Sequence, residues 1–194
     1  YESFTSEPVA FTPTETIMEF ENIVPASRLP YTNYSGLGFV VISKATNRSI
    51  ECKINIEEAG DYLIDARYSN GSGPWNTDNK CAVRSLAVNF IYAGVLIFPQ
   101  RGQDEWSDWG FSNSRKVKLK AGENIIRLTF EDWNHNMNVD VNTAMVDYLR
   151  VINNPDSDEA DEALINLINV PNRYIGKTFM AGLEEFAAQR NEHL

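Results

Sequence analysis

The chain has 194 residues, 43% of them hydrophobic, which is enough for one globular domain with a sizeable core plus an appendage. Its 17 basic and 27 acidic side chains give a net charge of −10, which argues against nucleic acid as a partner, because phosphates need clustered Lys and Arg. No apolar run approaches the roughly 18 residues of a transmembrane segment, so none is predicted. The opening residues 1–4 contain neither Met nor a basic and apolar leader, as expected of a mature or excised segment.

Alternating apolar and polar residues predict β-strands from the first third of the chain onward. The clearest case is residues 50–56, where apolar side chains at every second position indicate a half-buried strand. A turn at 58–61 precedes a second alternating run at 62–67. Leu86, Val88 and Phe90 predict another strand, and Ala93-Gly94 is expected to turn the chain back into residues 95–98.

Further along, residues 117–120 and 126–130 flank the turn residues Ala121-Gly122-Glu123-Asn124 and predict a hairpin. The last strand is expected at 146–152. Many short strands without intervening helical patterns favour an all-β fold, an antiparallel β-sandwich, over a parallel α/β sheet.

The composition changes at Asn153-Asn154-Pro155. Beyond this point, helical spacing of apolar residues predicts two amphipathic helices separated by Pro171. The tail carries eight acids against three bases. We therefore expect a lead-in at 1–14, a β-sandwich at 15–152, and an acidic helical tail or linker at 153–194. The tail must bury its apolar stripes either on the sandwich or on a protein partner. The residues that form these stripes are Leu164, Leu167, Ile168, Phe179, Leu183, Phe186 and Ala187.

Six segments in order along residues 15–152 resemble the non-catalytic carbohydrate-binding modules of families 35 and 6. They are Ile17-Met18-Glu19-Phe20-Glu21, Tyr34-Ser35-Gly36-Leu37-Gly38-Phe39-Val40, Ala59-Gly60-Asp61-Tyr62, Arg67-Tyr68-Ser69-Asn70-Gly71, Trp106-Ser107-Asp108-Trp109-Gly110 and Met145-Val146-Asp147-Tyr148-Leu149-Arg150-Val151. The resemblance implies a β-sandwich of jelly-roll type that binds a polysaccharide or oligosaccharide.

Aromatic and amide side chains in loop-like segments are the candidate sugar ligands, because sugar binding combines ring stacking with hydrogen bonds to hydroxyl groups. The resemblance assigns the stacking role to Trp109 and places Tyr34 and Asn70 in the cleft. Trp75 lies among Gly, Pro and Asn and is a further candidate, and Asn142 stands in for the family's polar residue near Met145. Trp106 is better explained as a rim or core-packing residue, and Trp133 could equally be a cross-strand aromatic that anchors a hairpin.

Glu19 and Glu21 are expected on the same side of an extended strand, and the resemblance implies that the first and last strands meet, which brings Asp147 close. Carboxylate oxygens suit Ca²⁺. The resemblance implies a structural calcium held by Glu19, Glu21 and Asp147. The alternative is a pair of exposed glutamates on an edge strand.

Cys52 and Cys81 lie in predicted strands and are either two buried thiols or, in an exported chain, a disulfide. The acids at 104, 105 and 108, and at 131 and 132, form local clusters, but no catalytic motif accompanies them, so enzymatic activity is not expected. 

The sequence therefore predicts a calcium-stabilised module of an exported bacterial glycan-degrading protein, secreted, periplasmic or at the cell surface. Its role would be to hold an attached or partner glycoside hydrolase on a polysaccharide. The alternatives are a structural or protein-interaction domain of a larger cell-surface assembly, and an accessory fragment of a glycoside hydrolase.

Overall fold

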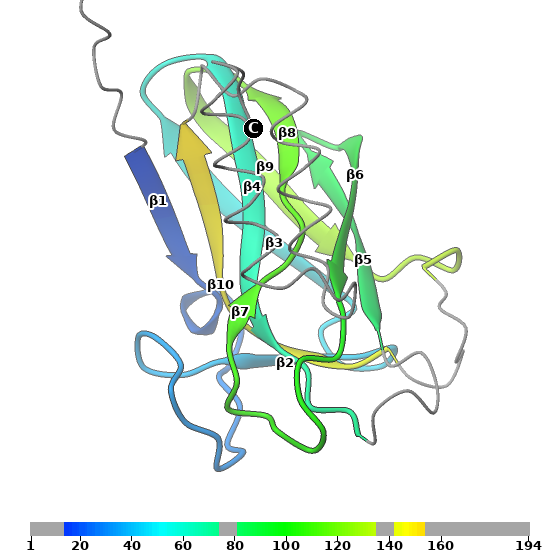
Figure 1. Cartoon of the computed structure of the whole chain (residues 1–194). Helices are drawn as coiled ribbons and strands as arrows, with labels where there is room; N and C mark the ends of the chain where they lie inside the picture. The colour runs from blue at the N-terminus through cyan, green and yellow to red at the C-terminus, as the bar shows by residue number, and fades with distance from the viewer. Residues whose placement is uncertain (1–13, 74–80, 135–141, 154–194) are drawn as a thin grey trace, which may run out of the picture.

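The structure is a computed structural model that describes residues 14–73, 81–134 and 142–153. Ten strands and one short 3-10 helix follow one another along these residues (Figure 1). They are β1 (Thr14–Glu19), η1 (Phe20–Asn22), β2 (Val40–Ile42), β3 (Ser49–Ile56), β4 (Gly60–Ser69), β5 (Ala82–Val88), β6 (Ile91–Phe98), β7 (Gly110–Phe111), β8 (Arg115–Leu119), β9 (Gly122–Thr129) and β10 (Ala144–Asn153). Among them, no helix is long and apolar enough to cross a membrane.

The strands form two antiparallel sheets packed face to face. The six-stranded sheet has the order β1-β10-β4-β7, with β2 also paired to β10 and β8 to β4. The four-stranded sheet has the order β3-β9-β5-β6. This arrangement confirms the predicted antiparallel β-sandwich, and the pairing of β1 with β10 confirms that the first and last strands meet. The predicted helical tail lies outside the described residues.

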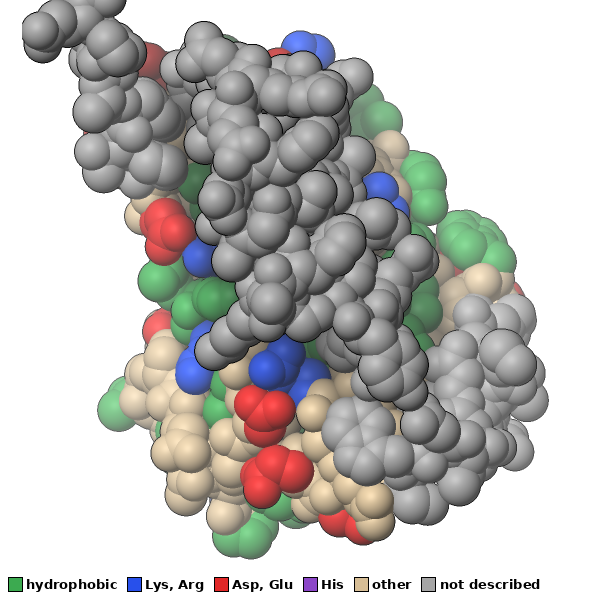
Figure 2. Space-filling view, viewed as in Figure 1, with side chains coloured by type: hydrophobic (Ala, Val, Ile, Leu, Met, Phe, Trp, Pro, Cys, Tyr) green, Lys and Arg blue, Asp and Glu red, His purple; other side chains and the backbone are tan. Residues whose placement is uncertain are grey.

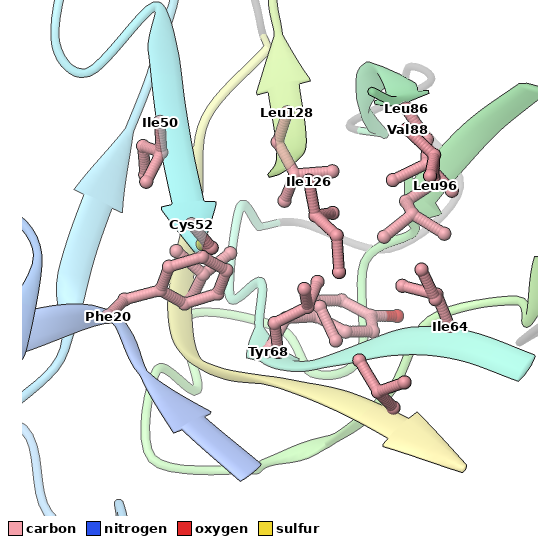
Figure 3. Close-up of a cluster of buried hydrophobic side chains, with 14 of the residues drawn as sticks. Phe20, Ile50, Cys52, Ile64, Tyr68, Leu86, Val88, Leu96, Ile126 and Leu128 are labelled. Carbon is pink, nitrogen blue, oxygen red and sulfur yellow. The ribbon is translucent and has the colours of Figure 1, made fainter. Parts of the chain in front are cut away.

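The hydrophobic core fills the space between the two sheets (Figure 3). From β3, the alternating residues Ile50, Cys52, Ile54 and Ile56 point inward, and each is 5% exposed or less, as the sequence predicts. They face the inward side chains of β4, which include Ile64 and Tyr68. Burial of each such aliphatic side chain contributes roughly 1.5–3 kcal/mol, so this alternation helps to hold the two sheets together. Cys52 and Cys81 are both buried, and no disulfide joins them.

The expected turn at Ala93-Gly94 is wrong. The chain turns at Asn89 and Phe90, both with positive φ (50° and 68°), and Gly94 lies inside β6. Asn tolerates the left-handed conformation that a two-residue hairpin requires. Gly94 has φ +119° and sits where the register between β5 and β6 shifts, so this glycine serves a bulge rather than a turn.

The two ends of the sandwich differ in their connections. The register places the loops that follow β1, β2, β4, β6 and β9 at one end, which we call the loop end and which is lowest in Figure 1. The opposite end carries short turns between β3 and β4, β5 and β6, and β8 and β9. There Thr14 pairs with Asn153, so the first residue of β1 and the last residue of β10 lie at the end of the sandwich away from the loop end.

Candidate functional site

Arg67 lies at the centre of the loop end. It belongs to β4, and its side chain is 22% exposed. One guanidinium nitrogen donates to the carboxylate of Asp147, and the other donates to the carbonyl oxygen of Asn33 at 2.9 Å. The guanidinium also lies 5.6 Å from the ring centroid of Trp109 and 5.9 Å from that of Tyr148. Arg67 therefore joins two strands, the loop after η1 and the loop before β7.

Five side chains from the same loops form what we call the aromatic cluster, namely Tyr31, Tyr34, Phe39, Trp106 and Trp109. The rings of Phe39 and Trp109 are 5.5 Å apart, and Tyr34 meets Trp109 edge-on at 6.4 Å. Trp109 is half-buried, and its indole nitrogen donates to the carbonyl oxygen of Thr32 at 2.7 Å. Tyr34 is 36% exposed. The cluster thus presents fixed aromatic surface beside a guanidinium.

The three carboxylates predicted as metal ligands gather around the turn at residues 35–37. The backbone amide of Ser35 donates to both carboxylate oxygens of Asp147, at 3.1 and 3.0 Å. The Ser35 hydroxyl donates to Glu19 at 2.5 Å, and the backbone amide of Leu37 donates to Glu21 at 2.9 Å. The turn that carries Tyr34 is therefore held by the same acids.

The expected extended geometry of Glu19 and Glu21 is wrong, because β1 ends at Glu19 and Glu21 lies in the 3-10 helix η1. The buried side chain of Phe20, 0% exposed, starts this helix. Both carboxylates nevertheless reach the same turn. Gly36 has φ +59°, and a Cβ there would clash with Glu21 Oε1 and lie 3.2 Å from Glu19 Cδ, so only glycine fits between the two acids.

The second carboxylate oxygens of Glu19 and Glu21 are buried and accept no hydrogen bond. Two orphaned carboxylate oxygens facing one turn are suitable donors for a hard cation. Asp147, by contrast, is engaged by Arg67 and Ser35. Within the described residues, no group of three or more Asp, Glu, His or Cys side chains has the geometry of a metal site. The residues therefore fit a cation held by Glu19 and Glu21, completed by oxygen atoms other than those of Asp147.

Burial dominates the electrostatics of Asp147, which is 0% exposed. Desolvation raises the pKa of its carboxyl from 3.8 to about 6, against the lowering effects of the Ser35 amide and the Arg67 guanidinium, and the nearby charge of Glu19 raises it further. A buried carboxylate of this kind depends on Arg67 for its charge balance. On the visible face of the molecule, Figure 2 shows acidic and basic side chains next to one another toward the loop end, with polar surface around them.

No family model matches the chain. Among solved structures, the family 35 carbohydrate-binding module from Clostridium thermocellum superposes with a TM-score of 0.54 at 23% sequence identity, over 71% of this chain and 97% of that module. The chain has the fold of a family 35 carbohydrate-binding module. That resemblance, expected from the sequence, is thereby confirmed at the level of the fold.

The family 35 fold of this chain also occurs as a small part of larger enzymes. Cycloisomaltooligosaccharide glucanotransferase from Niallia circulans is 31% identical over 104 residues, which are 54% of this chain and 10% of that protein. A solved structure of a Paenibacillus cycloisomaltooligosaccharide glucanotransferase, in complex with cycloisomaltoheptaose, superposes with a TM-score of 0.52 at 24% identity, over 69% of this chain and 18% of that chain. The chain thus spans about a tenth of the length of the curated relatives it matches.

Asn70 is buried inside the protein and forms hydrogen bonds with its own loop and with the end of β6. It is 0% exposed, its amide nitrogen donates to the carbonyl oxygen of Phe98 at 2.8 Å, and its amide oxygen accepts from the backbone of Ser72 at 3.1 Å. The Arg101 backbone amide donates to the carbonyl oxygen of Asn70. Asn70 thus fixes the loop after β4 to the loop after β6.

Asn142 is also engaged inside the protein. It is 3% exposed, its amide oxygen accepts from Arg84 and from the backbone of Val83, and its amide nitrogen donates to the carbonyl oxygen of Asn134 at 2.9 Å. Arg84 is 1% exposed and also donates to the carbonyl oxygen of Ser43 at 3.1 Å. Asn142 therefore belongs to a buried network at the start of β10. The remaining sugar candidate, Trp75, lies outside the described residues.

Sequence reasoning missed Arg67, the residue that connects Asp147 with the aromatic cluster. The signal was present, because Arg67 opens the Arg67-Tyr68-Ser69-Asn70-Gly71 segment that carries part of the family resemblance. On an alternating strand, Arg67 points to the opposite face from the core residue Tyr68. An arginine that points outward near the loop end of a central strand is a candidate binding residue, and this position could have identified Arg67.

Proposed function

We propose that the chain is a non-catalytic carbohydrate-binding module that binds its sugar at the aromatic cluster. The observation that carries this proposal is the placement of Tyr34 and Trp109 beside Arg67 at the loop end of a family 35 fold. Aromatic faces cover the apolar C–H surface of a pyranose ring, and a guanidinium donates to adjacent hydroxyl groups. Rigid loops on a sandwich suit such a site, because binding then costs little conformational entropy.

The proposed ligand class is an oligosaccharide or polysaccharide of glucose with isomalto-type linkages. The support is the printed names of the similar enzymes, which act on or bind cycloisomalto-oligosaccharides. A neutral sugar also agrees with the site, because the two described arginines there are already paired with acids, Arg67 with Asp147 and Arg101 with Asp108. An acidic sugar would instead need a basic side chain free of such a partner.

The proposed role is to hold an attached or partner glycan-active enzyme on its polysaccharide and so raise the local substrate concentration. Such a role places the protein outside the cytoplasm, in a secreted, periplasmic or cell-surface setting. A catalytic role is disfavoured, because glycoside hydrolysis needs a pair of carboxyl groups facing each other across the sugar. Two described acids at the loop end, Asp147 and Asp108, are each bound by an arginine.

We further propose that Ca²⁺ binds at Glu19 and Glu21 and has a structural role. The support is their two orphaned buried oxygens and the Gly36 turn that fits between them. The bound ion would neutralise the carboxylates and fix the turn that carries Tyr34. Chelation should lower the melting temperature and added Ca²⁺ should restore it. Glu21→Gln should remove this response, whereas Glu123→Gln, an exposed acid of β9, should keep it; an unchanged melting curve in chelator would reject the ion.

Calorimetric titration with isomalto-oligosaccharides tests the sugar site. Tyr34→Ala should weaken binding by roughly tenfold or more, since loss of one stacking ring removes about 1.5 kcal/mol. Tyr92→Ala is the matched control, because Tyr92 is 61% exposed at the start of β6, at the end of the sandwich opposite to the loop end. Equal effects of both changes, or no binding by the unchanged protein, would contradict the proposal. No sugar binding together with tight association with another protein would favour an interaction domain.

A further inference from the structure

The outward face of the six-stranded sheet carries a small apolar patch between a basic edge strand and the ion pairs of Arg150 with Asp65 and Glu15. On β4, Tyr62 and Ile64 point into the core, so Leu63 between them points outward. The register places Leu63 between Ile152 of β10 and Lys116 of β8, and all three side chains therefore share the outward face. Leu63 and Ile152 are half-buried. Ile17 of the neighbouring β1 is 47% exposed, and its register partner is Arg150.

The edge strand β8 is strongly basic. Arg115, Lys116 and Lys118 lie within its five residues, and Lys120 follows directly. Lys118 pairs with Asp61 at 3.0 Å, but Lys116 has no acidic partner among the residues that the structure describes. A hollow of about 310 Å³ lies along this edge and is lined by Asp61, Lys116, Val117 and Lys118. The face thus combines an apolar patch with a basic edge strand, on which Lys116 has no acidic partner among the described residues.

The C-terminal segment, residues 154–194, begins at this face. It follows Asn153, whose register partner on β4 is Tyr62, and Tyr62 pairs in turn with Val117 of β8. β8 is two strands away from β10, which is about 10 Å at the usual strand spacing. Five acids follow within residues 156–162, close enough in the chain to reach β8. Apolar residues then come at Leu164, Leu167 and Ile168.

We infer that the C-terminal segment folds back onto the outward face of the six-stranded sheet of its own chain. Its acidic start meets the basic β8, and the apolar residues that follow cover Leu63 and Ile152. Along the segment, the acids at 156–162 precede the apolar residues, which is the order that this arrangement requires. The segment has eight acids against three bases, and this negative charge complements the basic β8. It also covers an edge strand, which would otherwise be open to pairing with other chains. Because the segment starts opposite the loop end, the aromatic cluster stays open to sugar.

Zero-length carbodiimide cross-linking of the full chain tests this inference, because the reagent joins an amine only to a carboxylate in direct contact. Lys116 or Lys118 should be joined to an acid within residues 156–162. Two pairs already in contact serve as internal controls, Lys118 with Asp61 at 3.0 Å and Lys53 with Glu123 at 3.3 Å. A mixture of isotopically labelled and unlabelled chains separates links within one molecule from links between two. Links only between molecules would assign the face to a second copy and overturn the inference, as would control links without the predicted one.

Hydrogen exchange of residues 156–170 provides a second readout. Leu63→Glu should reduce the protection of this segment by roughly tenfold or more, because the new carboxylate would lie opposite Lys116, neutralise it and repel the acids of the segment. Ile125→Glu is the matched control, since Ile125 is a half-buried, outward aliphatic residue of the other sheet. Protection that falls equally in both variants, or that is absent in the unchanged protein, would contradict the inference. Sugar affinity should not change in either variant.

Discussion

Arg67 and Asp147 form an ion pair that links strands β4 and β10 beneath the loops of the candidate sugar site. Asp147 is fully buried, whereas Arg67 reaches from it to Trp109 and to the loop carbonyl of Asn33. The Ser35 amide binds the same carboxylate. The position of the aromatic cluster therefore depends on a charge pair in the strands below it.

Arg67→Gln should destabilise the protein by about 3 kcal/mol, because removing one partner leaves the buried carboxylate of Asp147 without its counter-charge. Arg127→Gln is the control. Arg127 pairs with Glu51 at 2.6 Å, but these side chains are 37% and 39% exposed, so its loss should cost at most about 1 kcal/mol. Denaturant unfolding of both variants measures the difference. Equal losses of stability would show that the buried Arg67–Asp147 pair contributes no more than the exposed Arg127–Glu51 pair.

Gly36→Ala and Gly122→Ala separate backbone strain from contact with the carboxylates. Both glycines have positive φ, +59° and +86°, so each alanine should cost about 1–2 kcal/mol in strain. Only at Gly36 does the new methyl group meet Glu19 and Glu21, whereas the space around Gly122 is open. Gly36→Ala should therefore lose more stability and also lose the stabilisation by Ca²⁺. If thermal unfolding shows the same loss for both and a retained Ca²⁺ response, the turn does not form the cation site.

The sandwich was predictable because its signal is local. The alternation at residues 50–56 gives the observed strand β3. The hairpin predicted from residues 117–130 is wrong, because β8 pairs with β4 in one sheet whereas β9 pairs with β3 and β5 in the other, and residues 122–124 of the expected turn belong to β9. The Asn89-Phe90 turn was missed, since a bulky Phe with φ 68° runs against the residue preferences of such turns. Gly94 offered a stronger turn signal but serves a bulge.

The site was harder to predict, because hydrogen-bond partners distant in sequence decide what a polar side chain does. Asn70 donates to Phe98 and Asn142 accepts from Arg84, and no pattern within either loop reveals these partners. Tyr34 and Trp109, by contrast, meet as the order of the family segments suggested. The roles of all five sugar candidates remain predictions.

Asn70→Asp should destabilise the protein by about 1–3 kcal/mol, because the carboxylate cannot donate to the Phe98 carbonyl and leaves that buried acceptor unpaired. Asn113→Asp offers a comparison at a less buried position, where the amide donates to Val95 at 3.0 Å. Chemical denaturation gives the two losses. A stable Asn70→Asp variant that nevertheless loses sugar affinity would show that Asn70 contacts the sugar.

The two thiols should be unreactive in the folded protein. Burial raises the pKa of both Cys52 and Cys81 from 9.0 to about 12, so neither is a thiolate at pH 8. The unfolded chain releases these protons near pH 9, before the folded protein does, so the free energy of unfolding should fall as the pH rises from 9 toward 12. A colorimetric thiol assay should find both groups only after denaturation. Rapid reaction of either thiol at pH 8 would contradict its burial.

The most direct test of the sugar-site proposal is an NMR titration of the intact chain with an isomalto-oligosaccharide, followed at the indole N–H signals of its four tryptophans. The Trp109 signal should shift, because its ring is part of the aromatic cluster and its N–H is bonded to Thr32. The Trp133 signal should stay in place, since no described aromatic ring contacts this exposed side chain. An unchanged Trp109 signal at saturating sugar, or shifts confined to Trp133 or Trp75, would contradict binding at the aromatic cluster.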